Sequence, residues 1–200
     1  SPQVAERLLK THAGQVTETR QVCILFFDIR DFTRYAEGKT PSEVVRYLNT
    51  LFGPLVEIVD QHGGIINKFL GDGFLAIFGA PIADEAHCLS ATRAALAMIA
   101  KVDALCAAEA IPKTRVGIGL HAGPVVTGSI GSQSRREYTV IGDTVNLAAR
   151  VEQQTKNQKA QILATEAVVS QLPSGEFPVE KLDPIHVKGR EESVQLYKLA

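Results

Sequence analysis

The sequence predicts an α+β domain in which helices pack on a sheet that is mostly antiparallel. Three observations lead to this prediction. An apolar run ends abruptly at Asp28, a helical apolar period follows a capping sequence at Thr40, and two short apolar segments flank the turn 71–73. A strand, a helix and then a tight hairpin are typical of a sheet whose helices all cover one face.

The first half of the chain supplies the clearest elements. Residues 21–28 are apolar at almost every position, so we expect a strand that is covered on both faces. Thr40, Pro41 and Glu43 match an N-cap, a first-turn proline and a capping-box glutamate. Apolar residues then recur every three or four positions, which predicts a helix that ends near His62, before two glycines.

The remaining elements follow from shorter patterns. We expect strands at 65–70 and 74–78, an Ala-rich helix at 84–110, a strand pair at 115–121 and 124–130 broken at Gly123-Pro124, a strand at 138–141, a helix at 142–154, and short strands that end with 194–199. The order is that of a ferredoxin-like βαββαβ core with extra C-terminal strands. We expect one domain over residues 21–200, with residues 1–20 as a lead-in.

Composition excludes several classes of protein. The 200 residues include 21 Lys+Arg and 22 Asp+Glu, and a net charge of −1 argues against binding nucleic acid through bulk charge. No apolar run approaches the roughly 20 residues of a membrane span. Cys23, Cys88 and Cys106 are scattered and lack metal-binding spacing, which favours reduced thiols and a cytoplasmic location.

Two carboxylates stand where strands end. Asp28 closes the first strand, and Asp72 lies at the tip of the glycine-flanked hairpin. If the two strands are neighbours, both carboxylates emerge at one edge, as a site for Mg²⁺ shared with substrate phosphates would require. A turn residue at Asp72 and a helix cap at Asp28 would explain the same pattern without any ligand.

Other residues suggest a nucleotide. Residues 29–33 leave the strand and open a helical turn, whose backbone amides would suit a phosphate. Asn146 and Arg150 are four residues apart on an expected helix and share a face that could hold a ribose and a phosphate oxygen. A solvated helix face explains that pair equally well, and Lys68 also fits an ordinary edge strand.

Four segments stand out together: FFDIRDFT at 26–33, NKFLGDGFLAIFG at 67–79, GIGLHAGPVVTGSIG at 117–131 and YTVIGDTVNLAARVE at 138–152. They resemble the catalytic domain of class III nucleotide cyclases, and within that family the bacterial adenylyl cyclases with Thr at the base-selecting position. Their order and spacing match over about residues 21–199. The resemblance implies the nucleotide cyclase fold and a homodimer. Each site would take metal carboxylates from one chain and base-reading and transition-state groups from the other.

The resemblance also assigns roles to individual residues. The metal site would hold two Mg²⁺ or Mn²⁺ ions on Asp28, Asp72 and the Ile29 carbonyl. The phosphate contacts would come from the amides of Phe32 and Thr33 and from Arg135 and Lys188. Lys68 and Thr139 would select the base, Asn146 would position the ribose, and Arg150 would stabilise the transition state.

The implied activity is that of an adenylyl cyclase, a phosphorus–oxygen lyase that converts ATP to 3′,5′-cyclic AMP and pyrophosphate. Lys68 can donate to adenine N1, and Thr139 can accept from the adenine amino group. A guanylyl cyclase and a catalytically silent nucleotide-binding module are the alternatives. A diguanylate cyclase fits less well, because its Gly-Gly-Asp/Glu-Glu-Phe signature is missing.

Two positions depart from the usual family pattern. Asp31 stands where many members carry Gly, and this adds a negative charge near the phosphates. Thr139 stands where many adenylyl cyclases carry Asp, and members with Thr there form a subgroup associated with bicarbonate activation. The resemblance carries that regulation over as an expectation, together with an upstream sensor module and tethering to the membrane through a preceding region.

Overall fold

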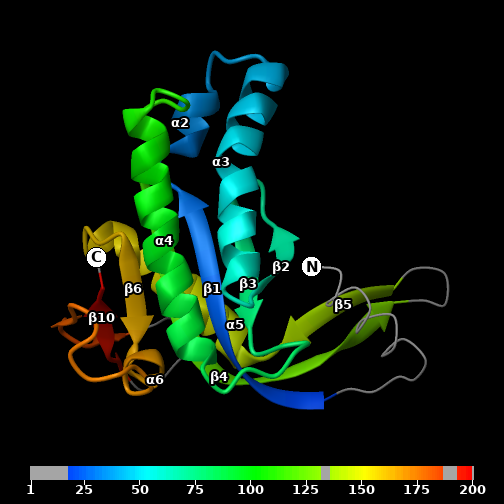
Figure 1. The fold of residues 1–200 in the computed structure, drawn as a ribbon, viewed down its shortest axis with the longest axis vertical. Helices are drawn as coiled ribbons and strands as arrows, with labels where there is room; N and C mark the ends of the chain where they lie inside the picture. The colour runs from blue at the N-terminus through cyan, green and yellow to red at the C-terminus, as the bar shows by residue number, and fades with distance from the viewer. Residues whose placement is uncertain (1–17, 132–135, 187–192, 200) are drawn as a thin grey trace.

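The computed structural model describes residues 18–131, 136–186 and 193–199. Its centre is strand β1 (Glu18–Ile29), which pairs antiparallel with β3 (Gly73–Phe78) on one side and β4 (Val116–Gly131) on the other (Figure 1). Within the described residues, eight strands form one sheet in the order β2-β3-β1-β4-β6-β10-β7, with β5 paired to β4. The other strands are β2 (Ile65–Phe69), β5 (Arg136–Ile141), β6 (Ile162–Thr165), β7 (Glu180–Lys181) and β10 (Leu196–Lys198), while β8 (Ile185–His186) and β9 (Ser193–Val194) pair separately.

The helices lie on both faces of this sheet. They are α2 (Phe32–Ala36), α3 (Pro41–Gln61), α4 (His87–Ala107), α5 (Asp143–Asn157) and α6 (Glu166–Val169). Helices α3 and α4 cross one face, and α5 packs on the other (Figure 1). The α+β class and the antiparallel sheet are confirmed, but the prediction that all helices cover one face was wrong. An open sheet whose central strand is apolar on both faces needs a cover on each side.

Side chains alternate between the two faces of β1, which explains why the sheet has a packed layer on each face. Cys23, Leu25 and Phe27 point into the cluster beneath α3 and α4, whereas Val22 and Ile24 point into the cluster that includes α5. All five are buried, and each such side chain stabilises the fold by about 1.5–3 kcal/mol. The apolar run of the sequence is therefore a strand covered on both sides, as predicted.

Strand β4 corrects a second prediction, because it runs unbroken through Gly123-Pro124. Pro124 lies opposite Gln21 of β1. On its other edge, β4 pairs with β6 only at 118–120 and with β5 only at 126–131. Pro124 falls between these two ladders, so its missing N–H removes no sheet hydrogen bond there. Pairing with the 12-residue β1 keeps the strand continuous.

Helix α3 begins and ends where the sequence predicts. The Thr40 hydroxyl accepts from the Glu43 N–H at 3.3 Å, and the Glu43 carboxylate accepts from the Thr40 N–H at 2.8 Å. These two bonds form the capping box. At the other end Gly63 has a φ of 75°, a left-handed conformation that terminates a helix. Among the described residues no helix is both long and apolar enough to span a membrane.

We predict that Thr40→Ala destabilises the domain by about 1 kcal/mol, which lowers Tm by about 2–4 °C for a protein of this size. The substitution removes the hydroxyl that satisfies the Glu43 N–H. Thermal unfolding of both proteins measures the difference. Ser42→Ala, in the same turn but outside the capping box, is the control, and an equal loss in both variants would contradict the assignment.

The same cap predicts a pH dependence. Hydrogen bonds from the Thr40 N–H and then from its hydroxyl lower the pKa of Glu43 below its ordinary value of 4.5. A depressed pKa in the folded state contributes stability that is complete above the ordinary value and is lost as the pH falls through the folded value. The Tm difference between wild type and Thr40→Ala should therefore shrink in acid. A constant difference would show that the Thr40 hydroxyl does not stabilise the charged form of Glu43, since the Thr40 N–H bond is kept in the variant.

Candidate active site

The structure brings Asp28 and Asp72 together at one edge of the sheet. Asp28 is the penultimate residue of β1 and lies opposite Gly73, the first residue of β3. Asp72 precedes Gly73 in the turn after β2, and its carbonyl accepts from the Ile29 N–H at 3.2 Å. Both aspartates line a pocket of 860 Å³, so the edge predicted for the two carboxylates exists.

The electrostatics of this edge are unfavourable for negative charge. The pKa of Asp28 is raised to about 6, first by burial and then by the negative charges of Glu152 and Asp72, while Arg30 acts in the opposite direction. Burial also raises the pKa of Glu152, again against the effect of Arg30. Carboxylates gathered in a partly buried pocket attract a cation, because a cation relieves the repulsion between them.

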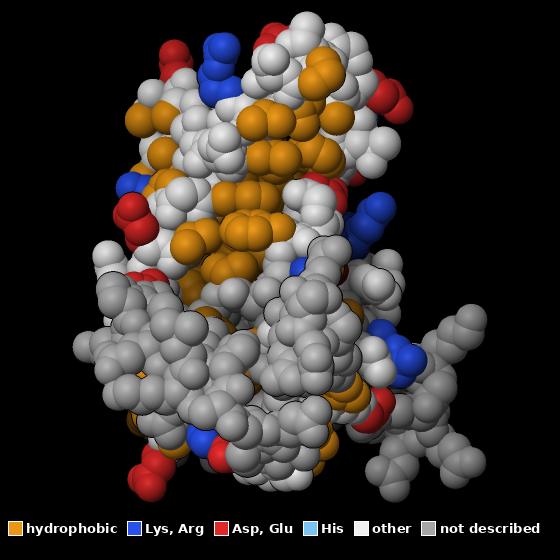
Figure 2. Space-filling model, turned by 90° about the vertical axis from the view of Figure 1, so that its right-hand side faces the viewer, with side chains coloured by type: hydrophobic (Ala, Val, Ile, Leu, Met, Phe, Trp, Pro, Cys, Tyr) orange, Lys and Arg blue, Asp and Glu red, His pale blue; other side chains and the backbone are white. Residues whose placement is uncertain are grey.

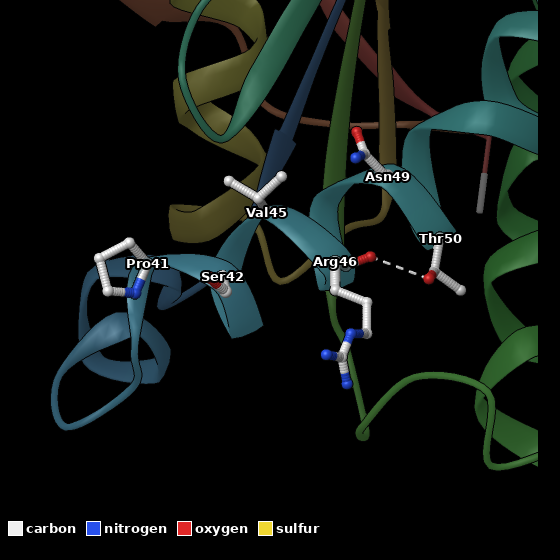
Figure 3. Close-up of a pocket in the computed structure, with 6 residues that line it drawn as sticks. All are labelled: Pro41, Ser42, Val45, Arg46, Asn49 and Thr50. Atoms are coloured by element: carbon white, nitrogen blue, oxygen red, sulfur yellow. Dashed lines mark hydrogen bonds between the residues drawn. The ribbon is translucent and has the colours of Figure 1, made fainter.

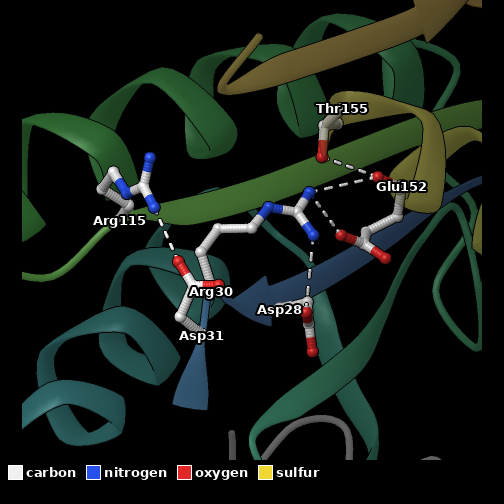
Figure 4. A network of polar contacts seen from close by, with 6 residues as sticks. All are labelled: Asp28, Arg30, Asp31, Arg115, Glu152 and Thr155. Carbon is white, nitrogen blue, oxygen red and sulfur yellow. Dashed lines mark hydrogen bonds and ion pairs between the residues drawn. The ribbon is translucent and has the colours of Figure 1, made fainter. Parts of the chain in front are cut away.

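Arg30 connects this edge to α5 (Figure 4). Its guanidinium lies 2.8 Å from the Glu152 carboxylate and 3.6 Å from the Asp28 carboxylate. Glu152 is on the face of α5 that packs against β4, and its own carbonyl also accepts from Arg30 at 3.3 Å. Sequence reasoning missed Glu152, although its position at the end of the 138–152 segment was a signal for it.

Asp31 carries a compensated charge. It adopts a φ of 58°, a left-handed conformation that glycine takes most easily. Its carboxylate pairs with Arg115 at 2.6 Å (Figure 4). The extra negative charge expected from the sequence therefore has a partner. Arg115 lines the same pocket, together with Lys156 in the last turn of α5 and Lys159, which follows this helix.

These cations were not predicted from the sequence. Arg115 directly precedes β4, whose first residues lie beside the end of β1 because the two strands are antiparallel. The antiparallel pairing of β1 and β4 places the Arg115 guanidinium in the pocket of the aspartates. This position follows from the register of the two strands and not from the local sequence. Phe32 and Thr33 begin α2 and line the pocket as well. The pocket thus combines acidic groups with basic ones, as a site for a metal-bound polyphosphate would.

The expected base-selecting residues lie away from this pocket, on two strands that do not pair with each other. Lys68 is on β2, and Thr139 is on β5. The Asn67 side chain donates to the Tyr138 carbonyl at 3.1 Å, so the residues that adjoin Lys68 and Thr139 are in direct contact. Neither residue lines the pocket of the aspartates.

Asn146 and Arg150 lie on the side of α5 that is turned away from Glu152. Arg150 and Glu152 are two residues apart, which separates them by about 200° around the helix axis. Asn146 is exposed and Arg150 is half-buried, and neither lines the aspartate pocket. Within one chain the structure does not bring this pair to Asp28 and Asp72. The other two expected phosphate contacts, Arg135 and Lys188, fall outside the described residues.

A second pocket, of 680 Å³, lies on the outer side of α3 (Figure 3). It is lined by Pro41, Ser42, Val45, Arg46, Asn49 and Thr50, and this lining includes no carboxylate. Exposed apolar side chains are found on the same side of the molecule, where Figure 2 shows hydrophobic groups gathered over its upper half. The exposed apolar side chains of α3 and β2 include Val45, which is 56% exposed, and Phe69, which is 54% exposed. The aspartate pocket is therefore the candidate for chemistry, and this side is a candidate contact surface.

Known adenylate cyclases are similar to this chain in sequence. The chain is 36% identical over 189 residues to Adenylate cyclase 1 of Rhizobium meliloti (strain 1021), which covers 93% of the chain and 28% of that protein. It is 37% identical over 190 residues to an adenylate cyclase of Anabaena cylindrica, covering 90% of the chain and 37% of that protein. The chain thus spans about a third of the length of these curated relatives.

Solved structures show the same fold. The adenylyl cyclase CyaB from P. aeruginosa superposes with a TM-score of 0.83 at 28% identity, over 92% of this chain and 96% of that one. The guanylyl cyclase Cya2 superposes with a TM-score of 0.81 at 31% identity, over 92% and 93%. Residues 15–200 match the family described as the Adenylate and Guanylate cyclase catalytic domain. The chain therefore belongs to this family of nucleotide cyclase catalytic domains.

Proposed function

We propose that this domain is an adenylyl cyclase that forms 3′,5′-cyclic AMP and pyrophosphate from ATP at sites between two copies of the chain. The observation that carries the proposal is the division of the expected site residues. Asp28 and Asp72 share one pocket, whereas Asn146 and Arg150 lie on the far side of α5. A second copy related by symmetry could bring the two groups together.

The donors at the sheet edge fit a hard divalent cation. Among the described residues no group of three His, Cys, Asp or Glu side chains could hold a metal ion. Mg²⁺, however, is commonly held by one or two carboxylates together with substrate phosphates, and Asp28 and Asp72 supply that number. The carbonyl of Ile29 is the third protein ligand in this proposal. When bound, two such ions would lower the pKa of the ribose 3′-hydroxyl and neutralise the departing pyrophosphate.

The chain's own residues would orient the triphosphate and stabilise the transition state. The amides of Phe32 and Thr33 and the guanidinium of Arg115 line the aspartate pocket, where they could contact phosphate oxygens. Asn146 of the other copy would hold the ribose so that its 3′-oxygen faces the α-phosphorus. Arg150 would meet the charge that develops on the α-phosphate, a contribution of about 10²–10³ in rate for one preorganised donor.

The apolar surface around α3 and β2 supports pairing of two copies. Val45 of α3, Phe69 of β2 and Leu70 after it expose much of their side chains, and Figure 2 shows apolar side chains gathered over the upper half of the molecule. Contiguous exposed apolar groups of this kind mark interaction surfaces. A second copy is the proposed occupant because the proposed site is incomplete without one.

We predict a preference for ATP over GTP. Lys68 can only donate a hydrogen bond, which suits adenine N1, and the Thr139 hydroxyl can accept from the adenine amino group. Guanine presents the opposite pattern, with an acceptor at O6 and a donor at N1. Cyclic nucleotide formation from each substrate, measured with Mn²⁺, tests this preference. Equal or faster turnover of GTP would favour a guanylyl cyclase, and no turnover of either would favour a silent nucleotide-binding module.

Mixing two inactive variants tests whether the site is shared between chains. Asp28→Ala and Arg150→Ala should each lower activity by about 10²-fold or more. Their mixture should recover activity, because one interface site of the mixed dimer then keeps both residues. Each variant mixed with itself is the control. If the mixture stays inactive while its chains exchange, the site lies within one chain.

The contact surface is tested separately with Val45→Asp. A buried charge would oppose pairing, so specific activity should fall at low protein concentration and recover as the concentration rises. Val179→Asp places the same charge at another exposed valine and serves as the control. Activity measured against enzyme concentration separates the two variants. Parallel curves for both would exclude Val45 from the interface.

A further inference from the structure

The guanidinium of Arg30 lies between two carboxylates and contacts them unequally (Figure 4). Its Nη2 lies 2.8 Å from Oε1 of Glu152 and donates to the Glu152 carbonyl at 3.3 Å. Its Nη1 is 3.6 Å from Oδ2 of Asp28, which is too long for a direct hydrogen bond. Arg30 is therefore anchored on α5 and only loosely paired with Asp28.

This arrangement is built into the fold. The Arg30 and Glu152 side chains are 15% and 10% exposed. A Cβ atom at Gly117 would lie 1.9 Å from Arg30 Nη2, and one at Gly119 would lie 2.3 Å from the backbone nitrogen of Glu152. Strand β4 thus lacks side chains at the two positions where the guanidinium and α5 approach it. The Thr155 hydroxyl also donates to the Glu152 carbonyl, at 2.6 Å, and fixes this end of the anchor.

The anchor matters because an arginine beside a free carboxylate tends to pair with it closely. Arginine and carboxylate commonly form two parallel hydrogen bonds of about 2.7–2.9 Å. Such a pair on Asp28 would occupy the oxygens that a divalent cation needs. The ion pair with the Glu152 carboxylate and the hydrogen bond to the Glu152 carbonyl hold the guanidinium instead, and Asp28 is left with the longer contact.

We propose that Glu152 is a positioning residue that holds Arg30 away from Asp28 and so keeps the Asp28 oxygens available to a divalent cation. This inference rests on the proposed cyclase function and adds two residues to it. Glu152 acts through Arg30 and contacts no substrate. The geometry of the anchor, and not the mere presence of a third negative charge, is what preserves cation binding.

Two variants separate geometry from charge. Glu152→Asp keeps the charge but withdraws the carboxylate by one methylene, so Arg30 loses its close contact and moves onto Asp28. The double variant Arg30→Gln/Glu152→Gln removes both the competing guanidinium and its anchor. If Glu152 acted only through its negative charge, Glu152→Asp would bind Mn²⁺ as the wild type does. If Glu152 acted only by stabilising the fold, the double variant would not recover Mn²⁺ binding.

The experiment measures Mn²⁺ binding at pH 8 from the electron paramagnetic resonance signal of the free ion, together with the Mn²⁺ dependence of cyclic nucleotide formation. Glu152→Asp should bind Mn²⁺ about tenfold more weakly, with a much smaller change in kcat at saturating Mn²⁺. The double variant should return to within about threefold of wild-type binding. Thermal unfolding verifies that both variants are folded.

Glu176→Asp is the matched control, because Glu176 forms a 2.6 Å pair with Arg93 and does not line the aspartate pocket. Wild-type Mn²⁺ binding by Glu152→Asp, or a double variant that binds no better than Glu152→Asp, would overturn the inference. A wild type that binds Mn²⁺ but forms no cyclic nucleotide would instead refute the proposed function, and the binding comparison would still decide the role of Glu152.

Discussion

The pairing of β1 between β3 and β4 is the constraint on which the candidate site depends. Both faces of β1 are buried, so a shift of one residue would turn its apolar side chains to the wrong layers. Phe27 stacks on Phe74 of β3 with 4.8 Å between ring centroids, directly before Asp28. Because this register is held by the core, Asp28 emerges beside the turn that carries Asp72.

The same packing creates an electrostatic imbalance. Asp28, Asp72 and Glu152 bring three carboxylates to one partly buried edge. The positive charge of Arg30 compensates only part of their negative charge. Burial of like charges is costly unless a counter-ion is present. A fold that gathers these groups from the end of β1, the turn before β3 and helix α5 is suited to a divalent cation, and in our proposal the unequal contacts of Arg30 leave room for one.

Helix α5 has a different proposed role on each of its two sides. Glu152 faces the sheet and anchors Arg30, while Asn146 and Arg150 face outward. The helical repeat makes this division unavoidable, since residues two positions apart point in nearly opposite directions. A symmetric pair of chains would therefore give each proposed site the inward face of one α5 and the outward face of the other.

The sequence by itself determined the α+β class, the capped helix α3, the hairpin at Asp72 and the family, because each depends on local pattern or on four motifs in order. Tertiary structure alone decided that α5 covers the opposite face of the sheet and that β4 passes unbroken through Pro124. It also decided that Arg115 lines the aspartate pocket and that Glu152 pairs with Arg30 behind it. These features depend on strand register and on contacts between residues more than 80 positions apart, and hydrophobic periodicity carries no information about either.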